Sequence, residues 1–370
     1  MNNQKIRVAI TQGDTNGIGY ELIFKTFSAP EMLELCTPII YGSPKIAAYH
    51  RNALDMQAHF SIITSADEAL DGRVNLVACF DDDVKVELGV VTEESSHAAI
   101  RALDRAMTDY RDGLYDVLVS APICPSCIKV NNIEFDSLRK YLQTCLGTKE
   151  ESMYMYLNDF MHVSLIADDL SLKEEIDQVT EVNIINKAAM LYRTLKRDFM
   201  IGNPRIAVLS MNPKGDREEE QTVIEPAVAR LTDAGMSAFG PYPAETFYGT
   251  GMYDVFDGIL AMYYDQGILP FKTLSLHEGV CLIANLPLIC TMPCSGPHFE
   301  DAGRGVADET AFRQAVYLAI DIYRNRISFD SSVVNPLPKL YHERHEERER
   351  SRYNGPKRPT RVERPGEAEQ

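Results

Sequence analysis

Basic residues are in the minority in this sequence. It has 37 Lys and Arg against 54 Asp and Glu, which gives a formal net charge of -17. Because a surface of this charge repels phosphate backbones and anionic lipids, we predict no nucleic-acid partner and no membrane partner. A small anionic metabolite could still bind, but it would need a local pocket of cations.

Long apolar runs are also missing. No stretch of eighteen apolar residues occurs, so the sequence predicts no membrane-spanning helix. The first ten residues, MNNQKIRVAI, hold too short an apolar run for a signal peptide. We therefore expect a cytoplasmic protein.

The eight cysteines do not form a recognisable metal or disulfide framework. A four-cysteine zinc site needs two CxxC pairs, and the chain has one, Cys124–Cys127. A long chain without a secretory signal is not a typical disulfide scaffold. We expect Cys36, Cys79 and Cys145 to pack as small apolar side chains in the core.

Strand-like and helix-like segments alternate through the first part of the chain, which predicts a mainly parallel sheet covered by helices. Further along, residues 154–157 and 163–167 favour an antiparallel pair of strands. Ser171 and Glu174 have the spacing of a capping box, for a helix that we expect to reach about Arg197. The other expected strands are 7–10, 38–41, 60–64, 74–80, 116–122, 205–210, 259–262 and 280–284, and the other expected helices are 20–27, 93–110, 222–234 and 310–323.

The end of the chain differs in composition. Residues 341–370 contain eight Lys or Arg, seven Asp or Glu and three Pro, with almost no apolar residue. Such a segment cannot bury enough surface to offset its conformational entropy. We predict a disordered charged tail over residues 331–370.

Two local stretches stand out. Residues 11–21, TQGDTNGIGYE, follow an expected strand and open a helix, where glycines let backbone amides face a ligand. Their spacing fits neither GxGxxG nor a P-loop, so the stretch taken alone favours a tight structural turn. Residues 261–272, AMYYDQGILPFK, place Asp265, Gln266 and Lys272 in one strand-to-loop passage. We interpret these three as candidate substrate-binding residues.

Together these stretches resemble the 4-hydroxythreonine-4-phosphate dehydrogenase family of vitamin B6 biosynthesis. The GD-x-x-GIG-x-E signature of that family appears at residues 13–21, and other family segments follow in order over residues 5–328. They are SAPI at 120–123, RIAVL at 205–209, NP at 212–213, GPYPA at 240–244, LAMY at 260–263, DQG at 265–267, PFK at 270–272, LP at 286–287 and AG at 302–303.

The resemblance implies a two-lobed α/β/α fold of the isocitrate dehydrogenase type, with a cleft between the lobes, in a homodimer. We expect residues 1–128 and 295–330 to form the first lobe and residues 129–294 to form the second. The implied reaction is the NAD-dependent oxidation and decarboxylation of 4-phosphohydroxy-threonine, with three histidines holding a divalent metal.

This chain departs from the family at the positions that carry the chemistry. The three metal histidines fall on Asp169, Lys214 and Tyr264. An ammonium has no lone pair to offer a metal, and a protonated phenol is a poor ligand. Most of the substrate-binding positions are also replaced, by Leu138, Arg139, Cys281 and Cys290, and a His-Gly-Thr motif near the cofactor becomes Ser295-Gly296-Pro297. Lys272 is retained.

From these replacements we predict no catalytic residue, no bound divalent metal, and a family activity that is lost or changed. Two other hypotheses stay open. The chain could be an active NAD-dependent decarboxylating dehydrogenase with replacement ligands such as His162 or His298, or a partner-binding scaffold that uses its charged tail. We also predict that Lys214 takes the metal's place and pairs with Asp169; the alternative is that both charges point into solvent.

Overall fold

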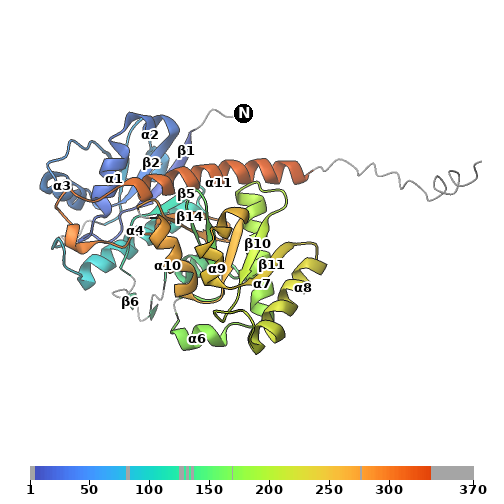
Figure 1. Cartoon of the computed structure of the whole chain (residues 1–370). Coiled ribbons are helices and arrows are strands. Elements are labelled where there is room, and N and C mark those ends of the chain that lie inside the picture. Colours follow the sequence, from blue (N-terminus) through green and yellow to red (C-terminus); the bar gives the residue numbers. More distant parts are fainter. Residues whose placement is uncertain are drawn as a thin grey trace, which may run out of the picture. The chain divides into compact units, whose positions relative to one another are not determined.

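A single 12-stranded sheet organises the protein (Figure 1). The computed structural model describes residues 5–80, 84–124, 129–130, 133–134, 137–168, 170–275 and 277–334. The strand order is β11-β10-β12-β9-β8-β13-β14-β5-β1-β2-β4-β3. The strands are β1 (Ile6–Thr11), β2 (Cys36–Gly42), β3 (Ser61–Ile63), β4 (Asn75–Ala78), β5 (Val117–Ser120), β8 (Met153–Leu157), β9 (His162–Leu165), β10 (Arg205–Leu209), β11 (Ser237–Tyr242), β12 (Gly258–Ala261), β13 (Val280–Ala284) and β14 (Ile289–Pro293), and β6 (Lys129–Val130) and β7 (Ile133–Glu134) pair separately.

The sheet is mostly parallel but reverses direction at its centre. β8 is antiparallel to both β9 and β13, and β13 is antiparallel to β14. All other neighbours in the sheet are parallel. The carboxyl ends of β9, β10 and β12 therefore meet at one edge of the sheet, and those of β1, β5 and β14 meet at the opposite edge. The expected parallel sheet and the expected β8–β9 pair are confirmed.

Helices bury both faces of the sheet. The helices are α1 (Gly19–Phe27), α2 (Pro30–Leu35), α3 (Pro44–Ala53), α4 (Glu93–Arg111), α5 (Leu138–Leu146), α6 (Leu172–Asp177), α7 (Glu181–Asp198), α8 (Glu225–Asp233), α9 (Ala244–Gly249), α10 (Tyr264–Ser275) and α11 (Thr310–Val334). Successive strand residues point to opposite faces, so Val8 and Ile10 join one core cluster while Ala9 joins another. This explains why the strands are nearly continuous apolar runs.

The glycine-rich turn after β1 packs closely against neighbouring backbone, where no side chain would fit. Gly13 has φ +72°, and a Cβ there would lie 2.5 Å from the carbonyl oxygen of Pro122; a Cβ at Gly19 would lie 2.2 Å from that of Gln12. The buried Asp14 carboxylate accepts a hydrogen bond from the Asn16 amide at 3.0 Å, and burial raises the pKa of Asp14. The turn thus locks β1 against the loop after β5.

Two predicted elements differ in kind from the structure. The helix expected from Ser171 to Arg197 is two helices, because Thr180 caps a new helix three residues after α6 ends at Asp177; the Ser171 capping box itself is confirmed. The passage from Tyr264 to Lys272 is the helix α10 and not a loop. The sequence did not indicate this helix because Pro270 lies within it, and proline is unfavourable in a helix interior.

The closing helix α11 is longer than expected. It runs to Val334, so residues 331–334 of the predicted tail are helical, and the rest of that tail lies outside the described residues. The Tyr323 hydroxyl donates to the Asp116 carboxylate at 2.8 Å, which ties α11 to the start of β5. Among the described residues, no helix combines the length and apolar character that a membrane crossing requires.

Candidate active site

The β12–α10 junction presents Tyr264 and Asp265 to solvent and buries Gln266. The Tyr264 side chain is 37% exposed, and Gln266 is 7% exposed. The Gln266 side-chain amide donates to the Ser210 carbonyl at 2.6 Å, and its oxygen accepts from the Met262 amide at 2.8 Å. With both ends of its amide bound to backbone, Gln266 positions the junction between β10 and β12.

A buried carboxylate lies beneath this junction. Glu175 of α6 accepts a hydrogen bond from the Tyr264 backbone amide at 3.1 Å and is 3% exposed. Burial raises the pKa of Glu175, and the nearby charges of Asp265 and Asp168 raise it further. Glu175, Tyr264 and Asp265 line a cavity of about 370 Å³. The lining of this cavity therefore contains two carboxylates and one phenol.

Beside it, Arg139 and Asp168 form a buried ion pair. The distance from Arg139 Nη2 to Asp168 Oδ1 is 2.5 Å, and the two side chains are 10% and 9% exposed. Arg139 also donates to the Ser152 carbonyl at 3.2 Å and lies over the Tyr154 ring. The guanidinium is therefore held by groups of the protein, although its Nε has no partner among the described residues.

Tyr156 connects these groups to the centre of the sheet. It faces Cys281 across the β8–β13 ladder. Burial raises the pKa of the Tyr156 phenol, and Cys281, Tyr264, Tyr154 and Asp168 raise it further in that order. These groups lie close enough to interact electrostatically, so the structure gathers Cys281, Tyr264, Tyr154 and Asp168 around one half-buried tyrosine.

Lys272 lies at the other end of α10, in a different cavity. Seven helical residues lie between it and Tyr264, and the eight steps along the helix axis span about 12 Å. Its cavity of about 520 Å³ is also lined by His277, Cys294, Ser295, Gly296 and Asp308. The cavity lies where β13 begins and β14 ends, at the opposite edge of the sheet from the carboxyl ends of β9 and β12. Lys272 and Asp265 thus line separate cavities.

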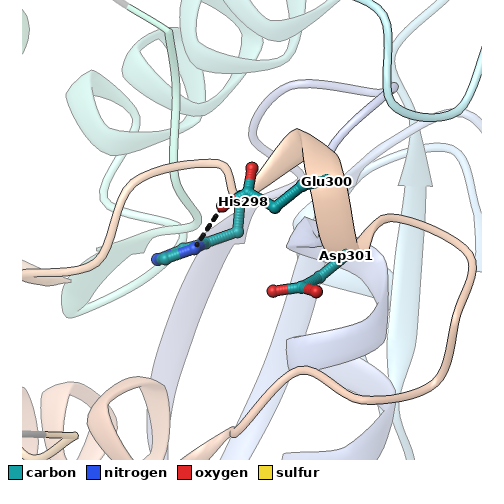
Figure 2. A group of neighbouring side chains, drawn as sticks. All are labelled: His298, Glu300 and Asp301. Atoms are coloured by element: carbon teal, nitrogen blue, oxygen red, sulfur yellow. Dashed lines mark hydrogen bonds and ion pairs between the residues drawn. The ribbon is translucent and has the colours of Figure 1, made fainter.

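His298 and Asp301 line the same cavity, and Glu300 lies beside them (Figure 2). The His298 ring lies 3.3 Å from the Glu300 carboxylate, and one ligand atom from each of the three residues falls within 4.8 Å of the others. Across the described part of the chain, no other group of three His, Cys, Asp or Glu side chains is arranged in this way. All three stand on or beside a short exposed turn.

The other predicted residues fall in different surroundings. Lys214 is exposed on the loop after β10 and makes no ion pair or hydrogen bond with a described residue. Asp169 lies outside the described residues, so the pairing of Lys214 with Asp169 stays a prediction. Leu138 and Cys290 are buried among apolar side chains, and Cys281 is buried beside Tyr156.

His162 does not join the candidate site. It stands at the beginning of β9, and its Nδ1 lies 2.9 Å from the Asp257 carbonyl oxygen while its ring contacts Phe199 at 4.7 Å. The end of β9 that approaches the site is the other one. His162 therefore lies away from the candidate site, and its position gives no support to a role as replacement metal ligand.

Two residues of the site were not anticipated. Glu175 belongs to a short capped helix whose polar sequence is typical of a solvated surface. Asp168 is adjacent to Asp169, which the resemblance assigns to a metal histidine. An acidic pair at 168–169 was the one available signal. The burial of both carboxylates depends on contacts distant in sequence, with Arg139 for Asp168 and with Tyr264 for Glu175.

The mainly parallel sheet covered by helices defines an α/β protein, and comparison with known proteins assigns its family. A sequence model described as "Pyridoxal phosphate biosynthetic protein PdxA" matches residues 34–319. The chain is 47% identical to a curated 4-hydroxythreonine-4-phosphate dehydrogenase of Bacteroides thetaiotaomicron, over 94% of this chain and 97% of that protein. It is 30% identical to one from Sulfurihydrogenibium, over 87% of this chain and 99% of that protein.

Solved structures agree with this assignment. The crystal structure of a 4-hydroxythreonine-4-phosphate dehydrogenase from Klebsiella pneumoniae matches with a TM-score of 0.72 at 25% identity, over 86% of this chain and 100% of that one. The enzyme from Burkholderia phymatum matches with a TM-score of 0.70 at 25% identity, over 86% of this chain and 99% of that one. This chain belongs to the PdxA family of pyridoxal phosphate biosynthesis, and both the resemblance and the α/β fold class expected from it are confirmed.

Proposed function

We propose that this chain is a divergent member of the PdxA family that binds a small anionic metabolite and in which the metal-dependent oxidation is lost or changed. The observation that carries the proposal is Lys214. It occupies a position that the family resemblance assigns to a metal histidine, and its side chain is exposed with no partner among the described residues. A metal site cannot use an ammonium as a ligand, because the nitrogen has no lone pair and carries a positive charge.

The remaining donors do not make up for this loss. Tyr264 is exposed at the start of α10, and Glu175 accepts a hydrogen bond from its backbone amide. Glu175 and Asp265 lie nearby, but among the described residues they form no three-ligand group with a third donor. The described residues therefore offer no donor set that fits the divalent metal of the family, and we assign no chemical step to it.

Lys272 supports the binding of an anion. It is the retained substrate-binding lysine of the resemblance, and it lines a cavity of about 520 Å³, a size typical of small-molecule sites. Burial raises the pKa of Cys294, which lines the same cavity, to about 12, although the nearby charge of Lys272 lowers it. We place the anionic group of the metabolite at Lys272. In the same cavity, Ser295 and Gly296 stand where the resemblance places the cofactor, so we assign any bound NAD to this cavity.

The second candidate function is an active NAD-dependent decarboxylating dehydrogenase. The 47% identity to a protein named 4-hydroxythreonine-4-phosphate dehydrogenase, over nearly the whole length of both chains, favours it. The two candidates differ in metal content and in the formation of NADH.

The deciding experiment compares the wild-type protein with the triple variant D169H/K214H/Y264H. A matched control, K45H/R73H/R324H, adds three histidines at positions far apart on the surface. We expect the wild-type protein and the control to contain no stoichiometric zinc, manganese or cobalt by mass spectrometry, and to form no NADH from 4-phosphohydroxy-threonine. We expect the triple variant to bind one metal per chain. One metal per wild-type chain together with NADH formation would overturn the first candidate and establish the second.

We also propose a homodimer and the division into lobes at residues 1–128 plus 295–330 and 129–294. The bond between Tyr323 and Asp116 supports the lobes, because it joins the closing helix to the N-terminal strands. The dimer rests on the family resemblance. Analytical ultracentrifugation showing a monomer at micromolar concentration would contradict it.

A further inference from the structure

A third cavity, of about 630 Å³, opens beside the C-terminal half of α7. We call it the α7 cavity. Its walls come from the loop after α5, from α7, from the turn between β13 and β14, and from α11. It shares no lining residue with either cavity of the candidate active site. Whatever it binds is therefore bound apart from the metabolite proposed above.

The lining of the α7 cavity is cationic in a strongly acidic protein. Its charged residues are Lys149, Arg193, Arg197 and Arg326 against Glu150 and Asp198, and Asp330 pairs with Arg197, which leaves an excess of one positive charge. The whole chain has a net charge of -17. A local excess of cations is what an anionic ligand would need to overcome the repulsion of the remaining surface.

Two of the four cations are already neutralised. Arg326 forms a bidentate pair with Asp198 through its Nε and Nη2, both at 2.8 Å. Arg197 forms another with Asp330, at 3.0 Å and 2.6 Å. Arg326 also donates to the carbonyls of Leu286 and Pro287, at 3.0 Å and 3.1 Å, which fixes the β13–β14 turn. These bonds build the walls of the cavity.

The other two cations remain unused. Lys149 and Arg193 are exposed, and neither forms an ion pair or hydrogen bond with a described residue. Thr148, next to Lys149, has a buried hydroxyl without a partner among the described residues. A buried hydroxyl that lacks a hydrogen bond costs free energy unless something supplies one. The cavity thus combines a fixed frame with two free cations and one unsatisfied hydroxyl.

We propose that the α7 cavity is a binding site for a phosphate-bearing small molecule. A phosphate dianion offers acceptors to each unused group. The planar Arg193 guanidinium can donate two parallel hydrogen bonds to it, Lys149 supplies a point charge, and the Thr148 hydroxyl donates a third kind of bond. The cavity volume lies within the range of small-molecule sites, so it accommodates a phosphorylated metabolite as well as free phosphate.

The test uses isothermal titration calorimetry on the full chain, with inorganic phosphate and glycerol 3-phosphate as separate probes and citrate as a carboxylate probe. The double variant K149Q/R193Q removes the unused cations and leaves the wall-building pairs intact. K45Q/R73Q removes the same charge from exposed positions elsewhere on the surface. K272Q removes the cation of the candidate active site, and thermal unfolding checks that each variant is folded.

We expect at least one phosphate probe to fill a saturable site that the wild-type protein, K45Q/R73Q and K272Q share with similar affinity and that K149Q/R193Q binds about tenfold more weakly or worse, whether or not a second site at Lys272 is also filled. The proposal is overturned if no phosphate probe binds the wild-type protein saturably, or if K149Q/R193Q binds as the wild type does. It is also overturned if K272Q alone loses binding, because the anion then occupies the active-site cavity. Binding of citrate but of neither phosphate probe would overturn the phosphate assignment.

Discussion

Arg139 and Asp168 join the first turn of α5 to the segment after β9 through a buried ion pair of 2.5 Å. The resemblance counted Arg139 among the replaced substrate-binding positions. The structure shows that this arginine is held by Asp168, by the Ser152 carbonyl and by the Tyr154 ring. The replacement therefore fills the place with an internal contact.

This pair predicts a large effect of removing one partner. Arg139→Met leaves the Asp168 carboxylate buried without its cation, and we expect a loss of about 3–5 kcal/mol in the free energy of unfolding. Urea denaturation measures it. The double variant R139M/D168L removes both charges and should recover most of the loss. A single-variant loss below about 1 kcal/mol, the size typical of an exposed pair, would contradict the buried pair.

The two hydrogen bonds of Gln266 predict that a substitution of the same shape but different polarity will destabilise the protein. In Gln266→Glu the carboxylate still accepts from the Met262 amide but cannot donate to the Ser210 carbonyl. Because two acceptors then face each other in a buried site, we expect a loss of about 1–3 kcal/mol, measured by urea denaturation. The exposed neighbour provides the control, since Asp265→Asn should change stability by no more than about 0.5 kcal/mol. Equal effects of the two substitutions would show that Gln266 does not position the junction.

His50 predicts a pH dependence. Its Nε2 donates to the Thr15 carbonyl at 2.7 Å, the residue is 1% exposed, and burial lowers the pKa of His50 below 6.5. Below pH 6.5 the unfolded chain takes up a proton that the folded chain refuses, so stability is present above this pH and is lost as the pH falls toward the folded pKa. The contribution reaches at most about 1.4 kcal/mol per pH unit.

The comparison of wild type with His50→Gln isolates this contribution. Chemical denaturation at pH 8, 6.5 and 5 measures the free energy of unfolding of both proteins. The wild type should lose more stability than the variant between pH 6.5 and pH 5, although the variant is less stable at pH 8. Parallel curves for the two proteins would show that His50 is not the titrating group.

The raised pKa of Glu175 predicts a pH dependence of stability opposite in sign to that of His50. Burial and the charges of Asp265 and Asp168 raise the pKa of Glu175, so its ionised form is disfavoured in the folded protein. For this group, stability is lost as the pH rises above the unfolded value of 4.5. Glu175→Gln keeps an oxygen for the Tyr264 amide and removes the charge, so it should raise the melting temperature at pH 8 but not at pH 4. Calorimetry at the two pH values measures this, and a lower melting temperature at pH 8 would contradict it.

Most of the secondary structure could be predicted because it depends on neighbouring residues. The alternation that placed Val8 and Ile10 opposite Ala9 is written in consecutive positions, and so is the capping box of Ser171 and Glu174. Helix α10 could not be predicted in this way. Its Pro270 argues against a helix, and contacts with β9 and β12 hold it there nonetheless.

The candidate site was predictable in part. The sequence by itself determined the family, because the family segments follow one another in order. The replacement of the metal histidines by Asp169, Lys214 and Tyr264 stays a prediction from the resemblance. Only the tertiary structure decided that Arg139 meets Asp168, that Glu175 is buried under Tyr264, and that Lys272 lines a different cavity from Asp265. The physical reason is that burial and ion pairing depend on which segments meet across the sheet. The residues next to 139 and 168, or next to 175 and 264, do not indicate that these pairs are in contact.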